Sequence, residues 1–127
     1  MKREAAEAAR RALGRDLAIA DVIRLNERLQ AVKEIHRGGN RLRALDRYPE
    51  LVDLFADIQR RHPGLSGNNK RAIQRAIAEI SDIEQAVERI EDTIPRDLSG
   101  DYNQILTGFQ STILPELEER LQQIADV

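Results

Sequence analysis

Residues 73–94 repeat apolar side chains at alternating steps of three and four, and this repeat constrains the fold more than any other feature of the chain. The series consists of Ile73, Ala76, Ile80, Ile83, Val87, Ile90 and Ile94. Because an α-helix has about 3.6 residues per turn, this spacing places the whole series on one face of a helix. We therefore expect a helix from about Asn69 to Ile94 that is ended by Pro95. Its Ile-rich face is interpreted as part of the chain's own core, and oligomerisation is the alternative.

Three further segments show the same period. We expect a first helix at 16–37 capped by Asp16, a second at 41–62 capped by Asn40, and a last one that begins after Ser99 or Asp101. The apolar stripe of the first contains Val22, Leu25, Leu29, Val32 and either Ile35 or His36. The second carries Leu42, Leu45, Tyr48, Val52, Phe55 and Ile58, and the last carries Tyr102, Leu106, Phe109, Ile113, Leu117, Leu121 and Ile124.

Two prolines fall inside these helical patterns, and one glycine interrupts the segment before the first of them. Pro49 either kinks the second helix or divides it into two, and Pro115 lies in the middle of the last helix. Both stripes keep their phase across the proline, which favours kinked, continuous helices. Residues 2–13 are good helix formers that offer only Ala as an apolar face, and Gly14 interrupts them. We interpret residues 1–14 as a helical extension that is frayed or docked on a partner.

Helices of similar length joined by short turns pack as antiparallel neighbours. The sequence therefore predicts an all-α, up-down-up-down four-helix bundle, with proline kinks in helices 2 and 4, as a single domain over residues 1–127. An apolar fraction of 41% is sufficient for a core, and an aromatic fraction of 3% argues against a sheet-rich fold.

There is no Cys, no apolar stretch of about 18 residues and no apolar segment near the N-terminus, so we expect a cytoplasmic protein without a membrane span.

Charge is distributed unevenly along the chain. Residues 1–75 hold 17 Lys/Arg against 10 Asp/Glu, a net charge of +7, whereas residues 76–127 hold 3 against 12, a net charge of −9. The helix expected at 69–94 starts with cations and ends with acidic residues, which is opposite to the order that the helix dipole favours. This arrangement suggests that binding, rather than stability, determines where these charges lie.

The basic residues gather in two groups, around the turn at 60–75 and around Gly38-Gly39. Backbone N–H groups at a helix start, together with nearby cations, can bind a phosphate or a carboxylate. The alternative is that these cations neutralise acidic residues of neighbouring helices or are simply solvated. The candidate anion- or partner-binding residues are Arg37, Arg41, Arg43, Arg47, Arg60, Arg61, Lys70, Arg71 and Arg75.

The residues that usually perform catalysis do not form a recognisable pattern. His36 follows an apolar stripe, and His62 precedes Pro63 in a turn that we expect to be exposed. No helical metal-binding spacing, phosphate-binding glycine loop or nucleophile motif occurs in the sequence. We therefore expect no catalytic residue, no metal, no cofactor and no small-molecule substrate.

Two functions remain after these exclusions. The first is a non-enzymatic helical interaction module, an adaptor or assembly subunit that acts through association with another protein or with itself. The second is a small subunit of a nucleoprotein complex, whose arginine-rich turns contact the RNA or DNA backbone without reading bases. The scarcity of aromatic residues and the acidic second half of the chain count against autonomous nucleic-acid binding.

Overall fold

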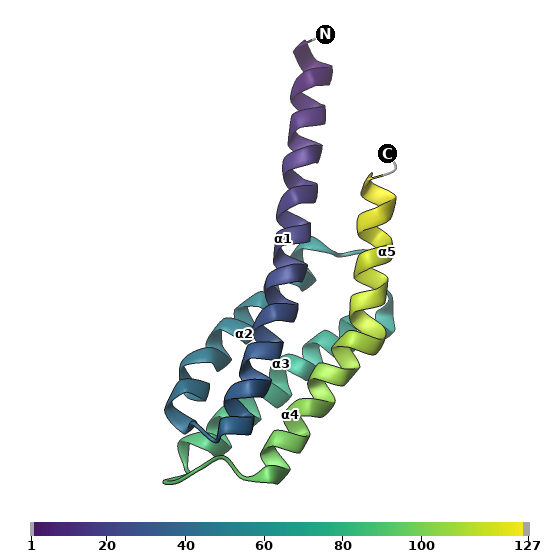
Figure 1. Cartoon of the computed structure of the whole chain (residues 1–127). Coiled ribbons are helices and arrows are strands. Elements are labelled where there is room, and N and C mark those ends of the chain that lie inside the picture. Colours follow the sequence, from purple (N-terminus) through teal and green to yellow (C-terminus); the bar gives the residue numbers. More distant parts are fainter. Residues whose placement is uncertain (1, 126–127) are drawn as a thin grey trace.

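The computed structural model describes the backbone of residues 2–125 and the side chains of residues 19–122. Over these residues all regular secondary structure is helical, and no strand is present (Figure 1). The elements are α1 (Lys2–Gly38), α2 (Arg41–Arg61), α3 (Gly67–Glu88), α4 (Arg96–Gly108), the π-helical turn η1 (Phe109–Ile113) and α5 (Leu114–Ala125). Since α4, η1 and α5 follow one another without interruption, they make one helical segment, and residues 2–125 therefore form four such segments.

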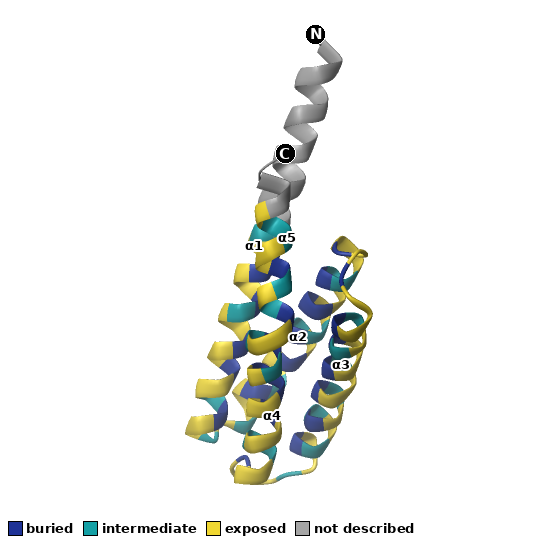
Figure 2. Ribbon diagram, turned by 90° about the vertical axis from the view of Figure 1, so that its right-hand side faces the viewer, coloured by how far each residue is buried: buried dark blue, intermediate teal, exposed yellow. Residues whose placement is uncertain are grey.

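The four segments pack around a shared interior. Helix α2 packs against α1 and α3, and α1 also contacts α4 and α5. Helix α3 completes the arrangement through its contacts with α4 and η1. The buried sides of the helices face one another and the exposed sides face outward (Figure 2). Within the described residues, no helix is both long and apolar enough to cross a bilayer.

The core consists of the apolar stripes expected from the sequence, with some exceptions. Val22, Leu25, Leu29 and Val32 of α1 are buried, as are Ile73, Ala76, Ile80, Ile83 and Val87 of α3. In the last segment the stripe is buried from Tyr102 to Leu117, whereas the side chain of Ile124 lies outside the described ones. The expectation was wrong for Leu42, which is 68% exposed. On α2 the inward face runs through Ala44, Tyr48, Leu51, Phe55 and Ile58, and Leu42 points away from it.

The first helix is longer than the sequence suggested. Its backbone is helical from Lys2 to Gly38, so neither a start at Asp16 nor a break at Gly14 occurs. A single glycine inside a helix costs only about 1 kcal/mol relative to alanine, which the surrounding Ala and Arg residues offset. We also expected residues 1–14 to be frayed or docked on a partner. Docking would involve their side chains, which lie outside the described ones.

Helix α3 ends at Glu88, six residues before the expected end at Ile94. The guanidinium of Arg41 donates from Nε to the carbonyl of Val87 at 2.9 Å and from Nη2 to the carbonyl of Glu88 at 2.8 Å. These bonds satisfy carbonyl groups that a longer helix would have used internally. Ile94 still reaches the core, with 7% exposure, from the irregular segment between α3 and α4.

Three prolines lie in or next to helices, and one of them gives a helix start that differs from the expected one. Pro95 is the N-cap of α4, so this helix begins at Arg96 and both Ser99 and Asp101 lie inside it. Helix α2 is continuous through Pro49, so it is not divided there. Pro115 directly follows η1, where the amide of Leu114 donates to the carbonyl of Phe109, one residue further back than in an α-helix.

Candidate functional site

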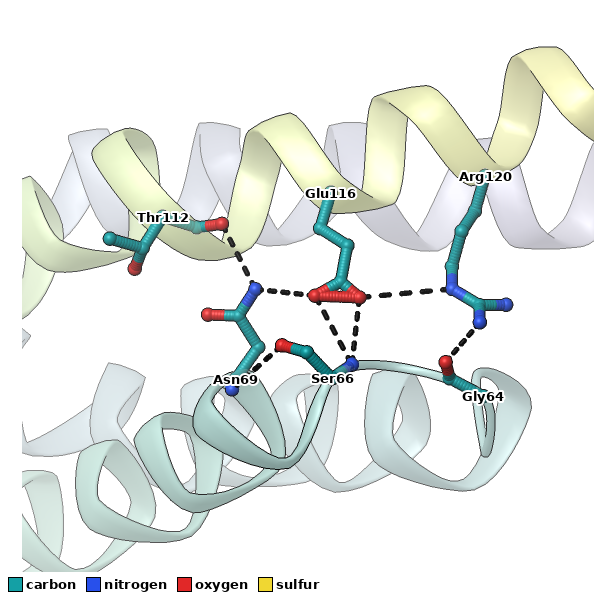
Figure 3. Close-up of polar contacts among 6 residues, drawn as sticks. All are labelled: Gly64, Ser66, Asn69, Thr112, Glu116 and Arg120. Carbon is teal, nitrogen blue, oxygen red and sulfur yellow. Dashed lines mark hydrogen bonds and ion pairs between the residues drawn. The ribbon is translucent and has the colours of Figure 1, made fainter.

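The start of α3, where the sequence suggested an anion site, already has a carboxylate against it. The Glu116 side chain of α5 accepts the backbone N–H of Ser66 with both oxygens, at 2.8 and 3.2 Å (Figure 3). Ser66 is also the N-cap of α3, since its hydroxyl accepts the N–H of Asn69 at 3.2 Å. A residue of the chain itself therefore occupies the positive end of this helix.

Further contacts fix this carboxylate in place. The Asn69 amide donates to Glu116 at 2.7 Å and to the carbonyl of Thr112 at 3.1 Å. Arg120 pairs with Glu116 at 3.8 Å and also donates to the carbonyl of Gly64 (Figure 3). Desolvation acts to raise the pKa of Glu116, but the hydrogen bonds from Ser66 and Asn69 and the charge of Arg120 outweigh it, and the pKa is lowered. The group is therefore ionised at neutral pH.

Most of the cations at 60–75 have partners on the same chain. Arg60 pairs with Asp57 at 2.8 Å, Arg61 pairs with Asp21 of α1 at 3.0 Å, and Arg71 donates to Asn68 at 2.6 Å. Lys70 is half-buried and Arg75 is exposed; within the described side chains neither has an ion pair. The structure thus gives three of these five candidate residues an internal contact, and it does not gather the five around one pocket.

The second basic group divides in a similar way. Arg41 is half-buried and holds the end of α3, and Arg37 makes a long, exposed contact of 3.9 Å with Glu34. Arg43 and Arg47 lie on one side of α2 and line the same cavity. This group and the 60–75 group are at opposite ends of α2, about 25 Å apart for a rise of 1.5 Å per residue.

A cavity of about 480 Å³ lies between α1 and α2. Its charged residues are Arg28, Arg43, Arg47, Glu34 and Glu50, and its apolar lining includes Ala31, Val32 and Ile35. Glu50 accepts from Arg28 at 2.7 Å and lies 3.6 Å from Arg47, so one carboxylate is shared by two guanidinium groups. We call this feature the α1–α2 cavity. Arg28 was not among the residues suggested by the sequence, because its partner comes from another helix.

A second cavity, of about 290 Å³, lies between α3 and α4 and has the opposite charge. Carboxylates at Glu79, Asp82 and Asp101 surround an apolar surface, and no cation is among its described lining residues. The apolar surface is formed by Ile83, Leu98 and Ile105. We call this feature the α3–α4 cavity. The sequence showed that the second half of the chain is acidic. It did not predict that these carboxylates gather around one cavity, because that depends on how α3 and α4 pack.

Both histidines are buried, each with 4% exposure, so the expectation of an exposed His62 was wrong. His36 Nε2 lies 2.5 Å from the hydroxyl of Tyr48, and its ring centroid is 4.6 Å from that of Tyr102. Desolvation lowers the pKa of His36 to about 4, and burial raises the pKa of both tyrosine hydroxyls. All three groups are therefore neutral at pH 7, and the Tyr102 hydroxyl donates to the carbonyl of Leu29 at 2.6 Å.

Desolvation also lowers the pKa of His62, with Arg120 and Arg61 acting in the same direction and Asp21 against it.

Within the described residues, no group of three His, Cys, Asp or Glu side chains is arranged to hold a metal ion. Comparisons with protein-family models, with curated proteins and with solved structures each return no significant match. The functional argument therefore depends on the residues and contacts described above.

Proposed function

We propose that this chain is a non-enzymatic helical interaction module that acts as an assembly subunit through protein–protein association. The observation that supports the proposal is the pair of oppositely charged cavities, each with an apolar lining, on the α1–α2 side and the α3–α4 side. Surfaces of opposite charge steer association and fix its orientation, and apolar contact supplies affinity. The exposed Leu42, beside Arg43 at the start of α2, adds apolar surface close to the basic cavity.

The partner proposed for the α1–α2 cavity is the α3–α4 cavity of a second copy. The α1–α2 cavity has Arg28, Arg43 and Arg47 against two glutamates, a net charge of +1, while the α3–α4 cavity has three carboxylates and no described cation. Two different surfaces that meet in this way form a head-to-tail contact, which builds a ring if it closes and a filament if it does not. A ring or a filament fits the proposed role of an assembly subunit better than a simple dimer does.

The proposal also uses the finer topology expected from the sequence. We take the four helical segments to run up-down-up-down, with bends at Pro49 and Pro115, because the short connection at Gly39-Asn40 favours antiparallel neighbours. In such a bundle the α1–α2 surface and the α3–α4 surface lie on different sides. One copy can therefore use both surfaces at the same time when copies associate head to tail.

The experiment that tests the proposal is light scattering of the purified chain over a range of protein concentrations, at low and at high salt. We expect association at low salt that weakens as salt screens the charges. The variant Arg43→Glu/Arg47→Glu is expected to abolish it, whereas Arg24→Glu, an exposed change on α1 outside the cavity, is expected to leave it intact. A monomer under all conditions, or association that Arg43→Glu/Arg47→Glu does not change, would overturn the proposal.

A charge-swap experiment makes the assignment specific. The variant Glu79→Lys/Asp82→Lys is also expected to lose association with itself. Mixed with Arg43→Glu/Arg47→Glu, it keeps the native contact between the two unchanged surfaces and adds a swapped contact in which lysines face glutamates, so we expect alternating assemblies of the two variants to form. The nucleic-acid alternative is tested in the same instrument with a short mixed-sequence RNA and DNA. A salt-sensitive complex lost in Arg71→Glu/Arg75→Glu, in place of self-association, would favour that alternative.

A further inference from the structure

Among the described residues, two large apolar side chains are exposed, and Leu42 is the more exposed of them. Its exposed fraction is 68%, and that of the other, Ile23, is 52%. A single exposed leucine is ordinary on a protein surface, so this exposure points to a binding role only when the surroundings support one. Residues 37–47 hold four arginines and one acidic residue, Asp46, so Leu42 lies in a segment with a net charge of +3.

The backbone that presents Leu42 is held on both sides. Asn40, the N-cap of α2, accepts the N–H of Arg43 with its side chain and the N–H of Ala44 with its carbonyl, both at 3.1 Å. Arg41, the residue before Leu42, donates to the last carbonyl groups of α3. An apolar side chain on a fixed backbone loses little conformational freedom when it enters a partner. Leu42 is therefore suited to act as an anchor.

The α3–α4 cavity has the complementary properties. Its apolar surface includes Ile83 and Ile105, and the carboxylates of Glu79, Asp82 and Asp101 surround that surface. Its volume of about 290 Å³ is just below the range of about 300–1,000 Å³ that is usual for small-molecule sites. The cavity therefore suits one or two side chains of a partner better than a complete small ligand.

The same copy does not satisfy this cavity. Among the described side chains, none of the three carboxylates takes part in an ion pair. Neither Lys nor Arg is among the described lining residues, and no residue of α2 is, so Leu42 of the same copy does not occupy the cavity. Negative charges gathered around one cavity repel one another, and guanidinium groups of a partner relieve that repulsion.

We propose that Leu42 of one copy inserts into the α3–α4 cavity of a second copy, with Arg43 and Arg47 facing the carboxylates around it. The inference rests on the self-association proposed above and deepens it, since it names the apolar side chain that is buried and the cavity that receives it. An apolar centre inside a charged rim is the usual anatomy of an interface. Asp46, one turn after Leu42, is also exposed, but helical side chains lean toward the N-terminus, so Leu42 points away from it.

The first test compares two matched truncations in the light-scattering experiment. Leu42→Ala removes the anchor and is expected to weaken association about tenfold or more, because a leucine side chain is no longer buried against apolar surface. The control is Ile23→Ala, which removes the other exposed apolar side chain and lines neither cavity, and it should leave association unchanged. Association of Leu42→Ala that is as tight as in the wild type, or equal weakening by the control, overturns the anchor.

The second test uses the absence of cysteine from the chain. Leu42→Cys and Gln104→Cys, the latter at an exposed lining residue of the α3–α4 cavity, are prepared separately and mixed under a mild oxidant. A disulfide needs the two Cα atoms within about 7 Å, which insertion of the anchor would provide. We expect the mixed disulfide, identified by its mass, to form at least about tenfold faster than in two control mixtures. One control replaces Gln104→Cys with Ser111→Cys, which is exposed outside the cavity, and the other replaces Leu42→Cys with Ile23→Cys.

The cross-linking result separates the anchor from the proposed function. A preferred disulfide between Leu42→Cys and Gln104→Cys supports the anchor, because the two copies must meet in this orientation. Association of the wild type without any preference over the controls means that copies meet through other surfaces, which overturns the anchor and leaves the proposed self-association standing. A wild type that stays monomeric, together with cross-linking no faster than in the controls, overturns both.

Discussion

The carboxylate of Glu116 accepts the backbone N–H of Ser66 across 50 residues of the sequence, and it thereby closes the N-terminal end of α3. The amide of Asn69 and the guanidinium of Arg120 hold the carboxylate in that position. The cations at 60–75 do not take part in this contact, and two of them pair elsewhere, Arg60 with Asp57 and Arg61 with Asp21. Part of that positive character, including the helix end itself, is matched by acidic groups of α1, α2 and α5.

Removing this carboxylate should destabilise the protein. We expect Glu116→Ala to lower the free energy of unfolding by about 1–3 kcal/mol, because the amides of Ser66 and Asn69 lose a charged acceptor. The measurement is urea denaturation at neutral pH. The matched control is Glu119→Ala, an exposed glutamate on the same helix, which should change stability little.

The same variant has a defined pH dependence. The pKa of Glu116 is lowered in the folded protein, so its contribution is present above the unfolded value of about 4.3 and is lost as pH falls through the folded pKa. The stability difference between the wild type and Glu116→Ala should therefore shrink in acid. A difference that is constant from neutral pH down to about pH 2 would contradict the proposed charge-assisted cap.

Arg41 should behave as a structural residue rather than as part of a binding surface. Its two hydrogen bonds to the end of α3 predict a loss of about 1.5–3 kcal/mol in Arg41→Ala, together with faster hydrogen exchange in the last turn of α3. Arg43→Ala, two residues away, removes an exposed guanidinium and should cost far less. Equal stability of the two variants would show that the Arg41 contacts contribute nothing.

Two adjacent glycines provide an internal comparison. Gly39 has φ +72°, and a Cβ at this position would lie 3.2 Å from Cβ of Thr93. We expect Gly39→Ala to cost about 1–2 kcal/mol, since alanine disfavours this backbone conformation. Gly38 is the last residue of α1 and has open space around it, so Gly38→Ala should be neutral or slightly stabilising. Thermal unfolding of both variants tests the contrast, and a reversed order would refute it.

His36 should make the protein sensitive to mild acid. Its pKa is about 4 in the folded chain and about 6.5 when unfolded, so the unfolded state binds more protons between these values. Stability should fall as pH drops from about 6.5 to about 4, by up to about 3 kcal/mol from this group. The variant His36→Gln should show a shallower fall, and because His62 is present in both chains its effect cancels. An imidazole of His36 that titrates near 6.5 in the wild type would contradict this.

The sequence was sufficient for those parts of the fold that depend on local period and capping. The stripe from Ile73 to Val87 became the buried face of α3, and Asn40 became the N-cap of α2 by accepting the N–H of Arg43 at 3.1 Å. Both features depend on residues within a few turns of one another. Helical periodicity and cap chemistry act at this range, so they are readable without a structure.

The features that were missed depend on residues far apart in the chain. Where α3 ends early, the carbonyl of Val87 accepts from Arg41, which lies 46 residues earlier in the chain. The closure of the α3 start by Glu116 has a separation of 50 residues, and no local pattern indicates it. Leu42 was assigned to the core because its spacing to Leu45 fits a helix, although the stripe that packs inward begins at Ala44. These features depend on how distant segments pack against one another, and a single sequence does not show that packing.

The position of Glu116 has a consequence for how the chain is made. A ribosome delivers the chain from its N-terminus, so Ser66 and Asn69 are synthesised well before the residue that caps them. Until α5 has emerged, the first turn of α3 has only the hydroxyl of Ser66 as an acceptor. A contact of such long sequence separation forms late in folding. The cap of α3 is therefore complete only after α5 has docked.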